Sequence, residues 1–483
     1  MNTKPTGYPT EPKHLWDRFF EITQIPRPSR KEEKIQDYII SIANTNNLNY
    51  KQDAEGNIVI YVPATKGYET HGAVIIQGHL DMVTVKTKDK DHNFETDPLQ
   101  LKIEDGWLMA DRTTLGSDNG IGVAAALATI TDETIEHPPL ELLFTVDEET
   151  GLNGATHLDA SMLSGKKMLN LDTEDWGELY IGCAGGLGYE LTRSFNTVPA
   201  ENGLKPYLLS ISGLAGGHSG VQIHEQLGNS LKLLAELLND FSELGYQLAE
   251  ISGGVAHNVI PRESSALLYL DDTQIHSFQQ KLATAKDRWL KILPKADHAF
   301  QLNLEASDKF SEVLEDKETL VSLMTLFPHG AATYNLNQPA DLVDLSSNFS
   351  LCQMSEGHLQ ILMSMRFFDR NEAISMDQKI HTLGRVFQLE MTNILDYPSW
   401  RPDFDNPMLE FSIKTYESLH GSKPEIKAIH AGLECGIIKD KLGDVDIISF
   451  GPTIKGAHSP TERLKISTVE PFYNLFKELL KQM

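Results

Sequence analysis

The sequence predicts an α/β fold in which a mixed, mostly parallel sheet is flanked by helices and interrupted by an inserted α+β segment. Short apolar runs such as NIVIYVP, GAVIIQGHLD, LELLFTVDEETG and KKMLNLDTED alternate with helical patterns such as GIGVAAALATITD. Runs that are apolar on both faces and alternate with helices are typical of strands buried in a partly parallel sheet. A chain of 483 residues also exceeds what one hydrophobic core usually supports, so we expect two domains.

The α/β elements occur in two separate parts of the chain. Two helical patterns, KHLWDRFFEITQIP and SRKEEKIQDYIISIANTNN, come first, and Ser29 is a candidate N-cap for the second. The apolar runs then predict strands up to residue 187. After residue 397 the α/β pattern returns. A helix, a strand and a closing helix are predicted in NPMLEFSIKTYESLHG, VDIISFGP and TVEPFYNLFKELLKQ. Residues 1–187 and 398–483 are therefore expected to form one discontinuous domain.

Residues 188–397 have a different pattern. KPYLLSISGL, SSALLYLDD and HLQILMSMRFFD have the alternation of amphipathic strands, and SFQQKLATAKDRWLKIL and MDQKIHTLGRVFQLEMTNIL have the period of long helices. This combination predicts an inserted α+β domain.

The charge balance excludes some classes of partner. The chain has 42 basic and 68 acidic residues, a formal net charge of −26. Such a chain repels phosphate backbones and anionic membrane surfaces, so we expect neither nucleic acid nor membrane as a partner. Most of the acidic residues are expected to be solvated surface.

The cysteines and the hydropathy pattern indicate a cytoplasmic protein. Cys183, Cys352 and Cys435 lie far apart without C-x-x-C spacing, so neither a disulfide framework nor a thiolate metal site is indicated. The first residues lack an apolar signal region, and the chain contains no run of eighteen apolar residues.

Histidine and acidic side chains collect where predicted strands end. The carboxyl ends of strands in an open α/β sheet form the edge at which ligands bind. The candidates at or beyond these ends, or just before the Ala-rich helix, are His79, Asp81, Asp118, Glu148, Glu149, Asp172 and His458. Taken singly, each is more often a turn or surface residue. Together they favour a bound cation, since adjacent buried carboxylates repel one another unless a cation compensates.

Counting charges predicts a pair of divalent ions. Three carboxylates, from Asp118, Glu149 and Asp172, together with a hydroxide balance two such ions. His79 with Asp172 would hold one ion, Glu149 with His458 the other, and Asp118 would bridge them. This nitrogen and oxygen set suits Zn²⁺, with Co²⁺ or Mn²⁺ as substitutes.

Two further residues beside these ligands are predicted to support the chemistry. Glu148 is not needed as a ligand and is free to act as general base toward water. Asp81 follows His79 by two positions and can accept the other ring N–H of that imidazole, which fixes its tautomer.

The order of these motifs resembles a known family. The blocks GHLDMV, SDNGIG, DEETG, NLDTED, GGHSG, HNVIP, AGLECG and AHSPTE span residues 78–462. In this combination the chain resembles the dinuclear zinc peptidases with a two-domain, zinc exopeptidase-like fold, and within them the aminoacyl-histidine dipeptidases, also described as cytosolic non-specific dipeptidases. The resemblance implies the same five metal ligands with Glu148 as the base, a lid or dimerisation role for residues 188–397, and a cis peptide between Asp118 and Asn119.

The resemblance also gives His218 a role. SGLAGGHSG is glycine-rich but lacks the G-K-[ST] ending of a phosphate-binding loop, so nucleotide binding is not expected there. In similar enzymes the histidine of this segment donates a hydrogen bond to the oxyanion of the tetrahedral intermediate, and in dimeric members it can come from the partner subunit. The alternative is that the glycines form a tight turn and His218 is structural.

The resemblance implies four substrate-binding residues. Asn258 and Arg366 would hold the C-terminal carboxylate of the substrate, Arg366 by a charge-assisted contact. A buried arginine needs an anionic partner, which can be structural or a substrate. Gly432 and Glu434 would line the pocket near the free amino group, although a loop at a helix start explains them almost as well. His430 is a weaker candidate for the same place.

The expected reaction is the metal-dependent hydrolysis of dipeptides with free amino and carboxyl termini, including Xaa-His dipeptides such as β-alanyl-histidine. An N-acyl amino acid deacylase, a desuccinylase or a tripeptidase would share every metal ligand and stays open as an alternative. A phosphotransfer protein is disfavoured by the missing phosphate loop. A catalytically inactive scaffold is disfavoured because all six metal-ligand and base positions are filled. A homodimer formed through the insert is also expected from the resemblance.

Overall fold

The computed structural model describes residues 3–334 and 342–483. The chain divides into two compact units, which we call unit 1 and unit 2. Unit 1 comprises Met1–Cys183, Trp400–Ala428 and Leu433–Met483, and unit 2 comprises Ala184–Ser399 and Ile429–Gly432. The catalytic and lid roles assigned to the corresponding parts of the sequence stay predictions.

Unit 1 is built on an eight-stranded sheet with the order β1-β2-β6-β3-β7-β23-β8-β22. In chain order its strands are β1 (Asn49–Gln52), β2 (Ile58–Val62), β3 (Val74–His79), β6 (Leu140–Thr145), β7 (Lys167–Asn170), β8 (Glu178–Cys183), β22 (Glu425–Ile429) and β23 (Asp446–Ser449). The four central strands, β6, β3, β7 and β23, are parallel, while the β1–β2, β2–β6 and β23–β8 pairs are antiparallel. The prediction of a mixed α/β sheet is confirmed, with the parallel pairs at its centre.

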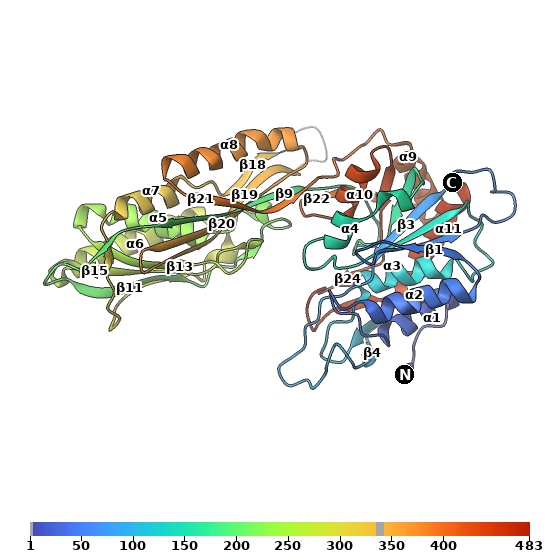
Figure 1. Cartoon of the computed structure of the whole chain (residues 1–483). Coiled ribbons are helices and arrows are strands. Elements are labelled where there is room, and N and C mark those ends of the chain that lie inside the picture. Colours follow the sequence, from blue (N-terminus) through green and yellow to red (C-terminus); the bar gives the residue numbers. More distant parts are fainter. Residues whose placement is uncertain (1–2, 335–341) are drawn as a thin grey trace. The chain divides into compact units, whose positions relative to one another are not determined.

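The central strands are apolar because both faces of the sheet are covered. Every residue of β3 and of β6 is buried. The helices of unit 1 are α1 (Lys13–Thr23), α2 (Glu33–Thr45), α3 (Ser117–Ala128), α4 (Asn153–His157), α9 (Pro407–His420), α10 (Glu434–Leu442) and α11 (Val469–Gln482). In Figure 1, α1, α2 and α3 lie together on one side of the strands, and α9 and α10 lie on the other. The Ala-rich α3 is buried along almost its whole length, which explains its small side chains.

The prediction for Ser29 is wrong. Helix α2 begins at Glu33, and its N-cap is Glu32. The Ser29 hydroxyl instead donates a hydrogen bond of 2.7 Å to Oδ2 of Asp81. The periodic pattern of the helix was recognised correctly, but the serine serves a tertiary contact because a buried carboxylate lies within its reach.

A second, four-stranded sheet of unit 1 joins segments from both ends of the chain. Its order is β24-β25-β5-β4, with β4 (Leu101–Glu104), β5 (Trp107–Ala110), β24 (Ile454–Lys455) and β25 (Arg463–Lys465). The antiparallel pairing of β25 with β5 places the residues after His458 beside the residues that precede α3.

Unit 2 contains a nine-stranded antiparallel sheet with the order β16-β11-β15-β13-β19-β20-β9-β21, in which β18 also pairs with β19. Its strands are β9 (Gly185–Ser194), β11 (Lys205–Ser212), β13 (Gln247–Gly253), β15 (Ser264–Leu270), β16 (Gln301–Ala306), β18 (Gly330–Tyr334), β19 (Val343–Ser355), β20 (His358–Phe367) and β21 (Glu390–Tyr397). Two short pairs accompany it, β10 (Thr197–Val198) with β17 (Val313–Leu314), and β12 (Gly217–His218) with β14 (Val259–Ile260).

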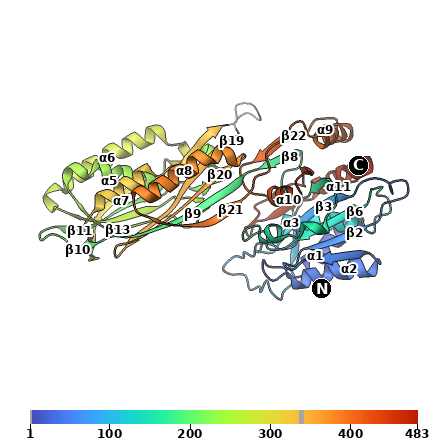
Figure 2. The same ribbon diagram turned by 45° about the horizontal axis from the view of Figure 1, so that its top comes forward.

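The helices of unit 2 cover one face of its sheet. They are α5 (Ser230–Asp240), α6 (Ile275–Ile292), α7 (Lys317–Leu326) and α8 (Arg370–Val386), and Figure 2 shows all four on the same side of the strands. The buried core between the layers contains large side chains from both, including Phe241 and Trp289 from the helical side and Phe349 from β19. Unit 2 therefore has a hydrophobic core of its own.

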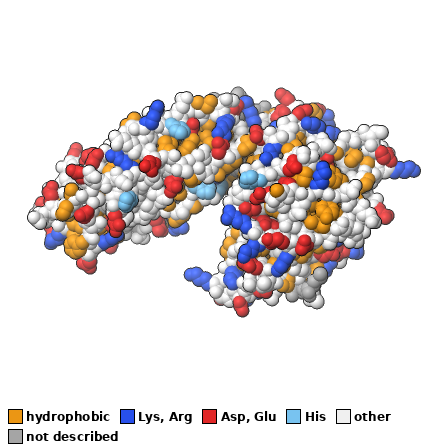
Figure 3. Space-filling model, viewed as in Figure 1, with side chains coloured by type: hydrophobic (Ala, Val, Ile, Leu, Met, Phe, Trp, Pro, Cys, Tyr) orange, Lys and Arg blue, Asp and Glu red, His pale blue; other side chains and the backbone are white. Residues whose placement is uncertain are grey.

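The surfaces of both units are strongly charged. Acidic and basic side chains are interspersed over the face that is drawn in Figure 3. Within residues 3–334 and 342–483, no helix combines the length and the apolar composition that a membrane crossing requires.

Candidate functional site

Neighbouring parallel strands deliver the predicted ligands to one edge of the unit 1 sheet. His79 is the last residue of β3, Glu148 and Glu149 follow β6, and Asp172 follows β7. His458 lies in the loop between β24 and β25. Because β6, β3 and β7 are adjacent and parallel, their carboxyl ends meet, as the sequence pattern predicted.

The carboxylate of Asp118 stands between two imidazoles. Nε2 of His79 lies 3.0 Å from its Oδ1, and Nε2 of His458 lies 3.2 Å from its Oδ2. Nε2 of His79 also lies 3.3 Å from Oδ1 of Asp172, and Nε2 of His458 lies 2.9 Å from Oε2 of Glu149. Each imidazole thus has one carboxylate of its own and shares the third.

These donor atoms fit a pair of metal ions. His79, Asp118 and Asp172 form one group whose ligand atoms all lie within 4.8 Å of one another, and Asp118, Glu149 and His458 form a second. Oδ1 of Asp172 and Oε1 of Glu149 are buried and make no hydrogen bond within the described structure. Buried carboxylate oxygens need a compensating partner, and two histidines with three carboxylates are a set that divalent cations bind.

The electrostatics of the cluster favour the uptake of positive charge. Burial, reinforced by the charges of Asp118 and Glu149, raises the pKa of Asp172 to about 6. Hydrogen bonds that the imidazole donates to Asp118 and Glu149 raise the pKa of His458 to about 11. Burial would raise the pKa of Asp118, but its contacts with His458 and His79 outweigh burial and lower it. Crowded, buried carboxylates raise the pKa of a neighbouring histidine because their negative charge favours its protonated form. The same negative charge attracts metal cations.

Asp81 organises the residues around the cluster. Its side chain is fully buried, and its Oδ1 lies 3.3 Å from Nδ1 of His79. Its two oxygens accept the backbone N–H groups of Glu148 and Glu149, at 3.1 Å and 3.2 Å, as well as the Ser29 hydroxyl. Asp81 therefore faces the imidazole on one side and fixes the backbone of both glutamates on the other.

Glu148 has the environment of a proton acceptor. One of its oxygens lies within 4.8 Å of ligand atoms of His79 and Glu149. Burial, together with the charges of Glu149 and Asp172, raises the pKa of Glu148 well above its ordinary value. A raised pKa makes a carboxylate a stronger base toward water.

The backbone after Asp118 has the form implied by the resemblance. The peptide bond between Asp118 and Asn119 is cis. The side chain of Asn119 donates a hydrogen bond of 2.5 Å to the carbonyl of Leu171, next to Asp172. A Cβ at Gly78 would lie 2.3 Å from Oδ1 of Asn119, so glycine is required immediately before His79.

In unit 2, His218 and Asn258 lie on neighbouring segments. His218 ends β12 and pairs with Val259 of β14, and the carbonyl of Asn258 accepts the N–H of Ser219 at 2.8 Å. Nδ1 of His218 accepts the N–H of Gly220 at 3.1 Å. A ring nitrogen that accepts a hydrogen bond carries no proton, so a neutral His218 carries its proton on Nε2 and can donate from there.

Arg366 lies in β20 and is 8% exposed. Its Nη1 donates to the hydroxyl of Tyr397 at 3.0 Å, and its Nε is buried without a hydrogen-bond partner within the described structure. No carboxylate among residues 3–334 and 342–483 forms an ion pair with it. A Cβ at Gly432 would lie 2.9 Å from the ring of Tyr397, so Tyr397 also contacts this glycine.

His430 belongs to the same unit as Arg366. Its Nε2 lies 2.7 Å from the hydroxyl of Ser346, which is the cross-strand neighbour of Arg366 in β19. Burial and the charge of Arg366 lower the pKa of His430 to about 3. His430 is therefore a neutral residue near the guanidinium.

Glu434 lies in unit 1 at the start of α10 and is fully buried. Its Oε2 accepts hydrogen bonds from Gln77 and Thr145, both at 2.6 Å, while its Oε1 has no hydrogen-bond partner in the described structure. Burial raises its pKa to about 8. The structure thus places Glu434 beneath the ends of β3 and β6.

Sequence reasoning gave no role to Tyr397, Arg27 or Glu462, all of which contact parts of the candidate site. The helix predicted over residues 376–395 is too long, since α8 ends at Val386 and Glu390–Tyr397 form β21, so Tyr397 lies beyond that pattern in a strand that was not predicted. Arg27 sits between two prolines and has no periodic signal. Glu462 did have one signal, since it ends the AHSPTE block that contains His458.

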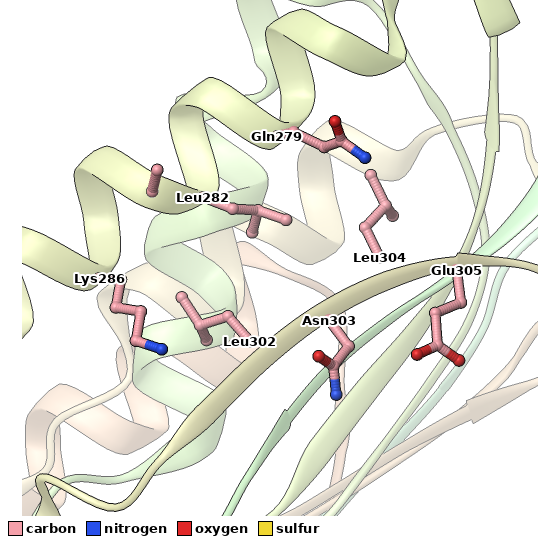
Figure 4. Close-up of a pocket in the computed structure, with 8 residues that line it drawn as sticks. Gln279, Leu282, Lys286, Leu302, Asn303, Leu304 and Glu305 are labelled. Carbon is pink, nitrogen blue, oxygen red and sulfur yellow. The ribbon is translucent and has the colours of Figure 1, made fainter.

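A separate pocket of about 300 Å³ lies in unit 2, between α6 and β16. Figure 4 shows Gln279, Leu282 and Lys286 from α6 facing Leu302 and Leu304 from β16, whereas Asn303 and Glu305 point to the other side of the strand. Its lining contains a single carboxylate and neither histidine nor cysteine. The candidate metal-binding groups described above are all in unit 1.

Comparison with known proteins identifies the family of the chain. Residues 75–482 match the peptidase family M20/M25/M40. The chain belongs to this family. The M20 chain is 36% identical over 478 residues to the cytosol non-specific dipeptidase of Escherichia coli strain K12, and the alignment covers 98% of each chain.

Two solved structures share the fold of this M20 peptidase. The crystal structure of aminoacylhistidine dipeptidase from Vibrio alginolyticus has a TM-score of 0.88 and 34% sequence identity, covering 98% of this chain and 97% of that one. The aminopeptidase PepT from Bacillus cereus has a TM-score of 0.56 at 14% identity, covering 97% and 98%, a likeness of fold alone. The predicted family and the predicted fold class are confirmed.

Proposed function

We propose that this M20 peptidase hydrolyses dipeptides with free amino and carboxyl termini, including Xaa-His dipeptides such as β-alanyl-histidine. The observation that carries the proposal is the shared carboxylate of Asp118, flanked by His79 and His458 at 3.0 Å and 3.2 Å. The near full-length likeness to a protein named cytosol non-specific dipeptidase supports the substrate class.

His79, Asp118, Glu149, Asp172 and His458 are proposed to hold two Zn²⁺ ions, for which Co²⁺ or Mn²⁺ could substitute. Two such ions would polarise the peptide carbonyl and acidify a water molecule. Zinc is favoured because the set combines imidazole nitrogen with carboxylate oxygen.

Glu148 is proposed to be the general base. It would take a proton from the attacking water and later give it to the departing amine. Asp81 would keep His79 in one orientation through its 3.3 Å contact with Nδ1. His218 would stabilise the oxyanion by donating from Nε2, the tautomer that its backbone contacts favour.

Four residues are proposed to bind the ends of the dipeptide. Arg366, a buried cation without an ion-pair partner in the described structure, would bind the substrate carboxylate together with Asn258. Gly432 and the unpartnered Oε1 of Glu434 would contribute to recognition of the free amino group.

The partners and location are part of the proposal. The substrate is a small peptide, and a homodimer through unit 2 is proposed from the resemblance. Mixing His218→Ala chains with Asp118→Ala chains would restore part of the activity only if His218 serves the partner subunit. A cytoplasmic location is supported by the name of the 36% identical relative and by three buried cysteines without disulfides.

The experiment that tests the function is a substrate panel. Steady-state rates are measured with Xaa-His and other dipeptides, with tripeptides, and with N-acetyl and N-succinyl amino acids. We expect hydrolysis of the free dipeptides, and the deacylase and tripeptidase alternatives are not favoured by the relatives. Hydrolysis of the acylated amino acids without hydrolysis of any dipeptide would refute the proposal.

A further inference from the structure

A buried carboxylate, Glu462, holds the backbone that carries Asp118. Glu462 is 2% exposed. Its Oε2 accepts the N–H groups of Leu115 and Gly116 at 2.7 Å and 3.0 Å. Its Oε1 accepts the N–H and the hydroxyl of Ser117, both at 2.7 Å, and approaches the N–H of Asp118 at 3.4 Å. Helix α3 has glycine at its N-cap and therefore no capping side chain of its own, and this distant glutamate accepts the backbone N–H groups around the start of the helix.

Glu462 also links two predicted ligands from distant parts of the chain. It follows His458 by four positions and directly precedes β25, which pairs with β5. The side chain of His458 itself is 54% exposed. Through Glu462 this loop is bound to the segment that positions Asp118, the other partner of His458.

A buried cation, Arg27, binds the same segment from the carbonyl side. Arg27 is less than 2% exposed in its side chain, and its Nη1 donates to the carbonyls of Leu80 and Asp81 at 2.8 Å and 2.7 Å. Its Nη2 donates to the carbonyl of Gly116. A Cβ at Gly116 or Gly120 would lie 2.5 Å or 2.7 Å from Nη2, so the two glycines make room for the guanidinium.

The positive charge of Arg27 interacts electrostatically with the carboxylates of the site. Within the described residues it forms no ion pair with a carboxylate, yet the charges that act on it most strongly belong to Asp81, Glu462, Asp118 and Glu149. A buried cation placed among several buried anions reduces their mutual repulsion. Arg27 precedes residues 75–482, the part of the chain that matches the family.

We propose that Arg27 and Glu462 are positioning residues that fix the Asp118 segment between them, so that the bridging carboxylate, His79 and His458 are pre-arranged for two cations. The proposal rests on the dinuclear site of the proposed function. Gly116 is its centre, since Glu462 binds the N–H of this residue and Arg27 binds its carbonyl. Partners that orient metal ligands in this way commonly change metal affinity by about 10-fold to 100-fold when they are replaced.

The test compares the zinc affinity of purified variants by competition with a chromophoric chelator. Glu462→Gln keeps the size of the side chain but turns an amide N–H₂ toward backbone N–H groups. Arg27→Lys keeps the positive charge but loses the planar guanidinium, whose two terminal nitrogens donate to the carbonyls of residues 80–81 and of Gly116. We expect both variants to bind zinc about 10-fold to 100-fold more weakly than the unaltered protein, and the visible absorption of their Co²⁺ forms to shift.

Glu141→Gln is the matched control. Glu141 is also buried in unit 1, at the opposite end of β6, and accepts the N–H groups of Ser164 and Gly165 and the Ser164 hydroxyl. The Glu141→Gln variant should be less stable than the unaltered protein but should bind zinc with the same affinity. Ser117→Ala removes one hydrogen bond to Glu462 and serves if Glu462→Gln does not fold; we expect a drop of a few fold in zinc affinity.

The outcomes separate this inference from the proposed function. If the unaltered protein binds two cations and all variants bind them as tightly, with unchanged Co²⁺ spectra, Arg27 and Glu462 are merely structural and the inference fails alone. If the unaltered protein binds no divalent cation, the proposed function fails and the inference fails with it.

Discussion

Nε2 of His458 lies 2.9 Å from Oε2 of Glu149, although the two residues belong to distant parts of the chain. The contact exists because β6 and the loop after β24 reach the same edge of the unit 1 sheet. His79 makes the same kind of contact with Asp172. His79 faces Oδ1 of Asp118, and His458 faces Oδ2. Each half of the cluster thus offers the same donor types, namely one imidazole nitrogen, one carboxylate of its own and one oxygen of Asp118.

Replacing Glu148 should separate catalysis from metal binding. Glu148→Gln removes the proton acceptor but none of the five proposed ligands, so we expect kcat to fall by about 10²-fold to 10⁴-fold while both cations stay bound. Metal content and steady-state rates are measured on the same preparation. Glu149→Gln, one position along the chain, is the control and should lose a cation. Normal turnover by Glu148→Gln would remove the role assigned to this residue.

Arg366 should control recognition of the substrate carboxylate. Loss of a charged hydrogen bond typically costs about 1.5–3 kcal/mol, so Arg366→Met should raise KM by roughly 10-fold to 100-fold with a smaller change in kcat. Each dipeptide is compared with its C-terminal amide, which the unaltered protein should hydrolyse poorly. Arg366→Met should lose this preference, and Tyr397→Phe, which removes the hydroxyl that Nη1 contacts, should keep most of it. An unchanged preference in Arg366→Met would place the carboxylate elsewhere.

His329 should make the protein less stable in acid. Burial and the charge of Lys232 lower its pKa to about 4, whereas the unfolded chain takes up this proton near pH 6.5. A lowered pKa means that the unfolded state binds more protons between these values, so the free energy of unfolding falls as the pH drops from 6.5 to 4. The expected slope is roughly 1 kcal/mol per pH unit.

The His329 prediction is measured by denaturant unfolding at pH 7.5 and pH 5.0. His329→Asn cannot titrate and keeps a side chain that can face Asn229, the present neighbour of Nδ1. It should therefore lose less stability between the two pH values than the unaltered protein. Equal losses would show that His329 is not responsible.

Much of the fold follows from periodicity. The strands β3 and β6 are buried at every position, which is why their sequences are mostly apolar. The helix α2 was found from its apolar spacing, but its beginning was misjudged at Ser29, because a tertiary hydrogen bond to Asp81 has no periodic signal.

The convergence of His79, Glu149 and Asp172 could be predicted because parallel strands end at one edge. The residues that hold the backbone around the ligands could not be predicted. Arg27 and Glu462 act on backbone N–H and carbonyl groups, which every residue type possesses, so nothing in the sequence marks the residues they bind. Tyr397 likewise reaches Arg366 through the pairing of both β20 and β21 with β9, which local patterns do not specify.

The central claim is that His79, Asp118, Glu149, Asp172 and His458 hold two divalent cations on which hydrolysis depends. The most direct measurement is the metal content of the purified protein by mass spectrometry, combined with dipeptide hydrolysis before and after exhaustive chelation. We expect two cations per chain, loss of activity on chelation, recovery with Zn²⁺, and loss of metal in Asp118→Ala. Full activity in protein that has been stripped of metal would contradict the account.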